Sequence, residues 1–269
     1  MFGNKSGWFS QVSVALFATF GLVGSANAQH NDGLVFQDGG KVIVGSMDVD
    51  CFSGVGGPGC DPNGNLENVF EAELAEMGTS PGAWGAADEP GFFSVPDGAE
   101  SFLPFGDNLP AGAAHSIDII LGPNTPVSIW YWDGTGSVNW QGVQNNEYFD
   151  IEGNGGSGGI LDGGSALNGI VLDSPAANGS FDTHPDFLLY GDGGTVDPTT
   201  GFYVLFGQTN IAGLTSSDPW AVVYDFGIEN EVLHEAAVDD IVGILPEPTA
   251  GTMLLFGLAG LATAGRKQR

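Results

Sequence analysis

An aspartate and a histidine stand two residues apart in segment 180–186, whose sequence is SFDTHPD. Residues two apart in an extended segment project from the same face, so the carboxylate of Asp182 and the imidazole of His184 would point the same way. Carboxylate oxygens and imidazole nitrogens are the groups with which proteins hold zinc and related divalent cations. The spacing therefore indicates a cation site. The alternative is a pair of polar residues near a strand end that share no ligand.

Motifs of known catalytic or nucleotide-binding sites do not fit this chain. Two glycine-rich matches within residues 153–159 lack the strand–turn–helix context that a dinucleotide loop or a hydrolase elbow requires. Segment 61–65 has calcium-loop spacing, but Leu66 stands at the position of the turn glycine and Ala72 at that of the bidentate acid. We therefore expect no enzymatic activity, and a secreted hydrolase is the weakest alternative. A looser calcium loop remains open, with ligands from Asp48, Asp50, Asp61 and Glu67.

The elements that would position such a site are short β-strands between glycines and prolines. Residues 70–74 alternate between apolar and charged, as in a strand with one wet face, whereas residues 127–132 and 202–206 are apolar on both faces. This pattern predicts an all-β fold, an antiparallel β-sandwich or jelly-roll-like single domain with one short helix at 229–242 and a loop or sheet crossing at 152–164. The expected strands are 41–46, 69–74, 116–121, 127–132, 169–172, 186–190, 202–206 and 220–226.

The N-terminus has the three parts of a secretory signal peptide. Lys5 supplies a positive charge, residues 12–23 form an uncharged apolar run, and Ala26 and Ala28 are small residues at the cleavage site. We therefore expect residues 1–28 to be removed by signal peptidase, with Gln29 as the first mature residue.

The C-terminus carries a second signal. Pro246, Glu247 and Pro248 precede an apolar stretch over 249–265, and the chain ends on Arg266-Lys267-Gln268-Arg269. This order resembles the PEP-CTERM sorting signal of Gram-negative bacteria, which a membrane protease, the exosortase, removes. The resemblance implies that residues 246–269 anchor the protein transiently in the inner membrane before it reaches the outer surface or the extracellular matrix. A permanent tail anchor is the alternative.

The mature body, residues 29–245, is strongly acidic. Lys41 is its only lysine or arginine, and it keeps 32 of the 33 acids, so its formal charge is 1 − 32 = −31. Such a surface excludes nucleic acid and anionic lipid as partners, leaving the C-terminal helix as the only membrane contact before processing. Divalent cations would relieve the repulsion. Adaptation to a saline habitat is the alternative explanation.

The only two cysteines, Cys51 and Cys60, flank a glycine-rich loop. Export to an oxidising compartment favours a disulfide between them.

The second half of the body resembles a particular PEP-CTERM family, the one repressed by the zinc-uptake regulator in cyanobacteria, with relatives in planctomycetes. The runs that carry the resemblance are Gly179-Ser180-Phe181 with His184, Gly201-Phe202-Tyr203, Ser217-Asp218-Pro219-Trp220, Val223-Tyr224 and His234-Glu235-Ala236. Members begin with histidines after the signal and carry His-x-His, where this chain has Asp182 at the first position. The resemblance implies a non-enzymatic role in zinc handling. The hypothesis is that one divalent cation, zinc or calcium, is bound by His30, Asp32, Asp182, His184 and His234.

Two further expectations concern aromatic and histidine side chains. A carbohydrate- or exopolysaccharide-binding module is the alternative function, and it would use exposed tryptophans as stacking platforms. The candidates are Trp130, Trp132, Trp140 and Trp220. His115 stands at a strand entrance and is interpreted as a surface residue.

Overall fold

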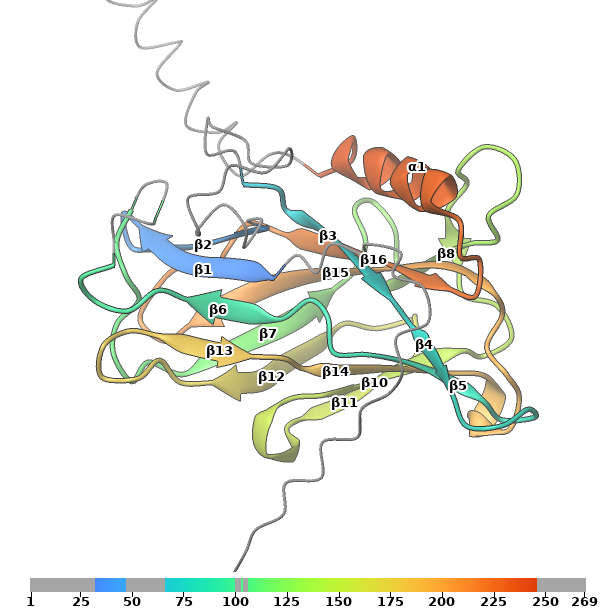
Figure 1. The fold of residues 1–269 in the computed structure, drawn as a ribbon, viewed down its shortest axis with the longest axis horizontal. Coiled ribbons are helices and arrows are strands. Elements are labelled where there is room, and N and C mark those ends of the chain that lie inside the picture. Colours follow the sequence, from blue (N-terminus) through green and yellow to red (C-terminus); the bar gives the residue numbers. More distant parts are fainter. Residues whose placement is uncertain (1–31, 47–65, 100–102, 104–105, 246–269) are drawn as a thin grey trace, which may run out of the picture.

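The structure is a computed structural model that describes residues 32–46, 66–99, 103 and 106–245. Strands in two layers enclose a common hydrophobic core, and a single α-helix lies outside one layer (Figure 1). The expected all-β single domain with one short helix is confirmed. Within the described ranges, no helix is both long and apolar enough to span a bilayer. His30, Cys51, Cys60 and the motif Pro246–Pro248 lie outside the described residues.

One layer is a seven-stranded sheet whose central path runs β12-β7-β15-β16-β3, with β8 pairing β15 and β9. Its strands are β3 (Val69–Glu73), β7 (His115–Ile120), β8 (Ile129–Trp132), β9 (Gln141–Gly142), β12 (Leu167–Asp173), β15 (Gly201–Ile211) and β16 (Trp220–Phe226). The long strand β15 is apolar on both faces because Tyr203 and Leu205 enter the core between the layers, while Phe202, Val204 and Phe206 face the helix side.

Helix α1 (Glu231–Val242) closes that outer side. Asn230 is its N-cap, and the side chain of Asn230 accepts a hydrogen bond from the amide of Leu233, which satisfies one of the free donors of the first turn. Ala237, Val238 and Ile241 pack against the outer face of the sheet. The helix expected over 229–242 therefore begins two residues later than expected, at Glu231, directly after its cap.

The other layer consists of two sheets. The five-stranded sheet, in the order β11-β10-β14-β5-β4, contains β4 (Ala75–Met77), β5 (Trp84–Ala87), β10 (Tyr148–Glu152), β11 (Gly158–Leu161) and β14 (Asp186–Tyr190). The four-stranded sheet, in the order β13-β6-β1-β2, contains β1 (Gly33–Asp38), β2 (Lys41–Ser46), β6 (Phe92–Ser94) and β13 (Phe181–Thr183). The chain passes from β5 to β6 and from β13 to β14, so both connections cross the boundary between the two sheets, which we call the seam.

All eight expected strands are present, and three of them, β2, β14 and β16, have the expected bounds. The interpretation of 152–164 as a loop is wrong in part, since it contains the short 3-10 helix Asn154–Gly156 and strand β11; a second such helix spans Asp192–Gly194. The pairing is not purely antiparallel either. Strand β1 runs parallel to β6, and β16 runs parallel to β3.

Candidate cation site at the seam

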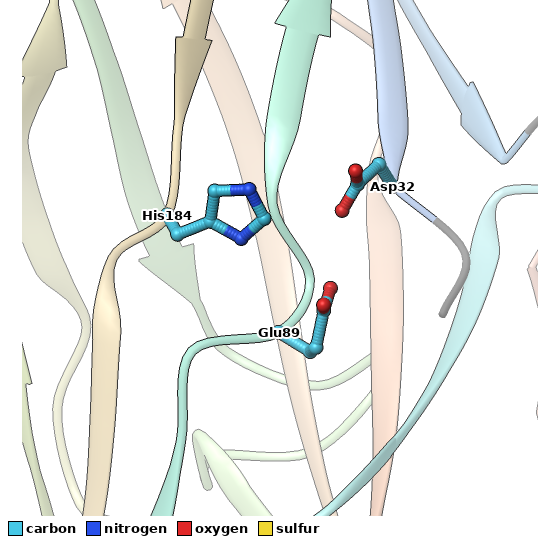
Figure 2. A group of neighbouring side chains, drawn as sticks. All are labelled: Asp32, Glu89 and His184. Carbon is cyan, nitrogen blue, oxygen red and sulfur yellow. The ribbon is translucent and has the colours of Figure 1, made fainter. Parts of the chain in front are cut away.

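Three potential metal ligands converge at the seam. One oxygen each of Asp32 and Glu89 and one ring nitrogen of His184 lie within 4.8 Å of one another, and the three side chains point toward a common space (Figure 2). They come from three segments: Asp32 precedes β1, Glu89 lies between β5 and β6, and His184 follows β13.

Strand register explains this convergence. Phe92 of β6 is paired with Gly33 of β1 on one side and with Thr183 of β13 on the other. One residue beyond these pairs, Asp32 and His184 stand level on either side of Gly91. Residues far apart in the sequence therefore meet because two short ladders share strand β6.

Gly91 keeps the space between the ligands open. A Cβ on this residue would lie 2.3 Å from Cε1 of His184 and 2.6 Å from Oδ1 of Asp32. Real Cβ atoms do not approach other atoms so closely, so any other residue would push the two ligands apart or fill the space between them.

The hydrogen bonding of His184 suits a metal ligand. Its Nδ1 lies 3.1 Å from the carbonyl oxygen of Asp88. A proton on Nδ1 would be donated to that carbonyl, which leaves Nε2 with its lone pair free. Metal-bound histidines commonly hold their second nitrogen in this way. Oδ1 of Asp182 lies 3.5 Å from the same Nε2, so a third acidic group is within reach.

The cluster is short of positive charge. Oδ1 of Asp32 is buried and accepts no hydrogen bond from any residue that the structure describes. Burial raises the pKa of Glu89, and so does Asp32, although the amide of Gly91 donates to Glu89 and works against them. Burial alone would lower the pKa of His184, but the Asp88 carbonyl and the carboxylates of Asp32, Glu89 and Asp182 raise it above its ordinary value. The three carboxylates therefore make the space between these ligands attractive to a positive charge, for which a metal ion and a proton on Glu89 or His184 compete.

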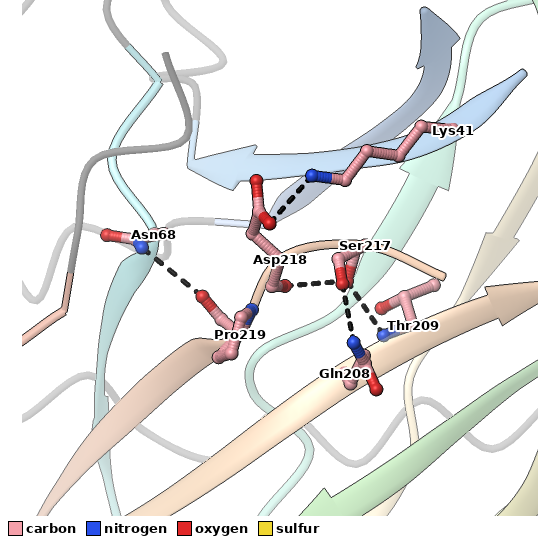
Figure 3. Close-up of polar contacts among 7 residues, drawn as sticks. All are labelled: Lys41, Asn68, Gln208, Thr209, Ser217, Asp218 and Pro219. Carbon is pink, nitrogen blue, oxygen red and sulfur yellow. Dashed lines mark hydrogen bonds and ion pairs between the residues drawn. The ribbon is translucent and has the colours of Figure 1, made fainter. Parts of the chain in front are cut away.

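The single lysine of the body is engaged elsewhere. Nζ of Lys41 lies 2.6 Å from Oδ1 of Asp218, on the loop that leads into β16 (Figure 3). That loop is itself held in place, because the Ser217 hydroxyl accepts the Thr209 amide and the Ser217 carbonyl accepts the Gln208 side chain. Lys41 therefore cannot neutralise the carboxylates at the seam.

The structure brings together Asp32, Asp182 and His184 of the predicted set, but not His234. His234 is 6% exposed, its Nε2 lies 3.0 Å from the carbonyl oxygen of Val223, and its ring packs on Phe202 beneath α1. His234 is spaced at helical intervals from Ala237, Val238 and Ile241, the other buried residues of α1, and this spacing is the sequence signal for a core position.

Glu89 was not among the predicted ligands. It lies in the run Asp88-Glu89-Pro90-Gly91-Phe92, which extends the family resemblance into the first half of the body, but the run has no second ligand type at a spacing that indicates a metal site. The interpretation of His115 as a surface residue is wrong, because its side chain is fully buried.

A second acidic group lies under the start of α1. Carboxylate oxygens of Glu71, Glu231 and Glu235 are within 4.8 Å of one another. Burial raises the pKa of Glu71, which the nearby His234 opposes and the neighbouring carboxylates reinforce. This group has no imidazole among its ligand atoms, and it provides a matched comparison for the seam site.

Three of the four tryptophans proposed as stacking platforms are buried in the core. Trp130, Trp132 and Trp220 are 6%, 3% and 0% exposed and belong to the hydrophobic clusters. Trp140 is partly buried, packs against one of these clusters, and donates from Nε1 to Asp240 of α1 at 2.9 Å. Of the four candidates, only Trp140 is partly exposed.

Comparison of the chain with models of known protein families and with curated proteins found no match.

Proposed function

We propose that this protein is an exported surface or matrix protein without enzymatic activity that binds a divalent cation at Asp32, Glu89 and His184. The observation that carries the proposal is the convergence of these ligands around a glycine-lined space, with one buried carboxylate oxygen that accepts no hydrogen bond. The terminal signals support processing by signal peptidase and exosortase and delivery to the cell surface.

Zinc is the preferred ion. Calcium sites are built from oxygen ligands, whereas a histidine nitrogen combined with carboxylates is typical of zinc and other transition metals. Asp182 is the additional acidic group next to His184, and His30 lies two residues before Asp32, so either could complete the coordination. The two-layered sheet architecture fits a sandwich module that presents this site at its seam.

Zinc titration by calorimetry tests the proposal. We expect one site in the wild-type protein and a loss of affinity of at least about tenfold in His184→Ala, since removal of even an outer-shell partner of a metal ligand costs about 10- to 100-fold. Gly91→Ala retains every ligand yet places a methyl group in the space between them, so it should lose affinity to a similar degree.

Glu235→Gln is the control, because it removes one charge from the second acidic group and leaves the seam intact. Equal heats for the wild type and His184→Ala would contradict the proposal, and so would an equal loss in Glu235→Gln.

A further inference from the structure

A histidine is buried in the core directly below the seam. The side chain of His115, at the start of β7, is 0% exposed, and within the described part of the chain neither of its ring nitrogens has a hydrogen-bond partner. Its ring packs against Phe181 at a centroid distance of 4.4 Å and against the edge of Phe92 at 6.1 Å. Such a residue is unusual, because buried polar atoms are nearly always paired.

The two phenylalanines belong to the strands that carry the cation ligands. Phe92 begins β6 and follows the Glu89–Gly91 connection, and Phe181 begins β13, which continues into Asp182 and His184. We call these two strands the β6–β13 pair. It has three residues in each strand, and only two residue pairs join β6 to β1. Short ladders of this kind open locally at a lower free energy than the central strands.

A proton on His115 would have no partner. Burial alone lowers its pKa from 6.5 to about 3, with no contribution from any charged group. Strands β6 and β15 carry no acidic or basic side chain. Three aspartates lie on β7 and on the neighbouring strands β12 and β13. Asp182 is exposed on the outer face of β13, Asp118 of β7 accepts the Gly169 amide, and Asp173, the ladder partner of His115 on β12, accepts the Ser174 amide. The charged imidazole can therefore be accommodated only by reaching water.

We propose that His115 makes the cation site releasable by acid: when its imidazole is protonated, the β6–β13 pair lifts from the core, and Glu89 and His184 separate from Asp32. The inference rests on the proposed cation site. The coupling is reciprocal, so a bound cation holds the pair closed and opposes the protonation of His115.

Hydrogen exchange at pH 6.0, 5.0 and 4.0 in the presence of EDTA tests the opening by itself. After correction for the intrinsic exchange rate, the opening equilibrium of amides in the β6–β13 pair of the wild type should rise about tenfold for each pH unit relative to that of His115→Leu, since opening lets His115 take up one proton. Glu89 and His184 titrate in both proteins, so their contribution cancels in this ratio. Amides of the central strand β15 serve as the internal control and should not follow this trend.

Zinc added at pH 6.0 then tests the coupling. It should slow exchange in the β6–β13 pair of the wild type, and between pH 6.0 and 4.0 the wild type should lose zinc affinity at least about fivefold more than His115→Leu. Equal pH dependence of exchange in the two proteins would overturn the proposal, and so would zinc that binds without slowing exchange in the pair. Absence of zinc binding at any pH would instead reject the cation site, while the exchange data would still decide the acid-driven opening.

Discussion

Replacing His115 by leucine is expected to make the protein more resistant to acid, by about 1.4 kcal/mol of unfolding free energy for each pH unit below the ordinary histidine value. The pKa of this imidazole is about 3 in the folded protein, compared with 6.5 for an exposed histidine. Between these values the unfolded chain binds one proton more than the folded chain. The unfolding free energy of the wild type therefore decreases as the pH falls from 6.5 towards 3. Leucine binds no proton, so the variant does not lose this part of its stability.

Urea unfolding at pH 7.5, 6.0, 5.0 and 4.0 in EDTA measures this difference. At pH 7.5 the two proteins should be similar, or the variant more stable, because leucine removes two buried nitrogens without partners. His184→Asn provides a control of opposite sign, since the pKa of His184 is raised and its contribution is present at low pH and lost as the pH rises. Parallel stability curves for the wild type and His115→Leu would contradict the assignment of His115 as a neutral core residue.

The seam shows how a sheet boundary produces a site. Within a continuous sheet, side chains project from either face and the backbone amides are consumed by the ladder. Between β5 and β6 and between β13 and β14 the ladders are interrupted, so the Asp88 carbonyl and the Gly91 amide are free to bind His184 and Glu89. The same interruption brings the start of β1 close to both connections, which adds Asp32.

The strands that sequence reasoning found are those with a strong local signal. Residues 220–226 and 186–190 are dense in aliphatic and aromatic side chains and are bounded by turn residues, so their bounds could be predicted. Strands β6 and β13 have three residues each and include Ser94 and Thr183, and they are strands only because they pair with each other and with β1. No local pattern identifies such segments.

The ligands of the candidate site that could be predicted from the sequence are those that lie close together in the chain. Asp182 and His184 are neighbours in the chain, whereas Glu89 enters through a pairing that links residues more than ninety positions apart. The burial of His115 could have been predicted from alternation, because His115, Ile117 and Ile119 share one face of β7 and both isoleucines are in the core. The spacing of the apolar residues around a histidine therefore predicts its burial better than the polarity of the imidazole does.

A buried glutamate makes a different contribution, to stability. Glu147 is 1% exposed and lies just before β10. Its Oε1 accepts the amide of Thr199 at 2.6 Å and also the Thr199 hydroxyl, and its Oε2 lies 3.2 Å from the hydroxyl of Tyr203. Burial and the nearby Glu147 raise the pKa of Tyr203, so its hydroxyl stays protonated and can donate. Glu147 thus ties the segment before β15 to the core.

Glu147→Ala is expected to lower the unfolding free energy by about 3 kcal/mol, since it leaves the Thr199 amide without its acceptor in a buried place and opens a cavity. Glu147→Gln retains one carbonyl oxygen for Thr199 and should lose less than half as much. Glu152→Ala, which removes an exposed carboxylate at the other end of β10, should change stability by less than about 0.5 kcal/mol. Urea unfolding at pH 7.5 distinguishes the three variants. If Glu147→Ala were as stable as Glu152→Ala, the hydrogen bonds of Glu147 would contribute nothing to the stability of the fold. If Glu147→Ala is the least stable variant and Glu147→Gln the next, Thr199 depends on a buried acceptor.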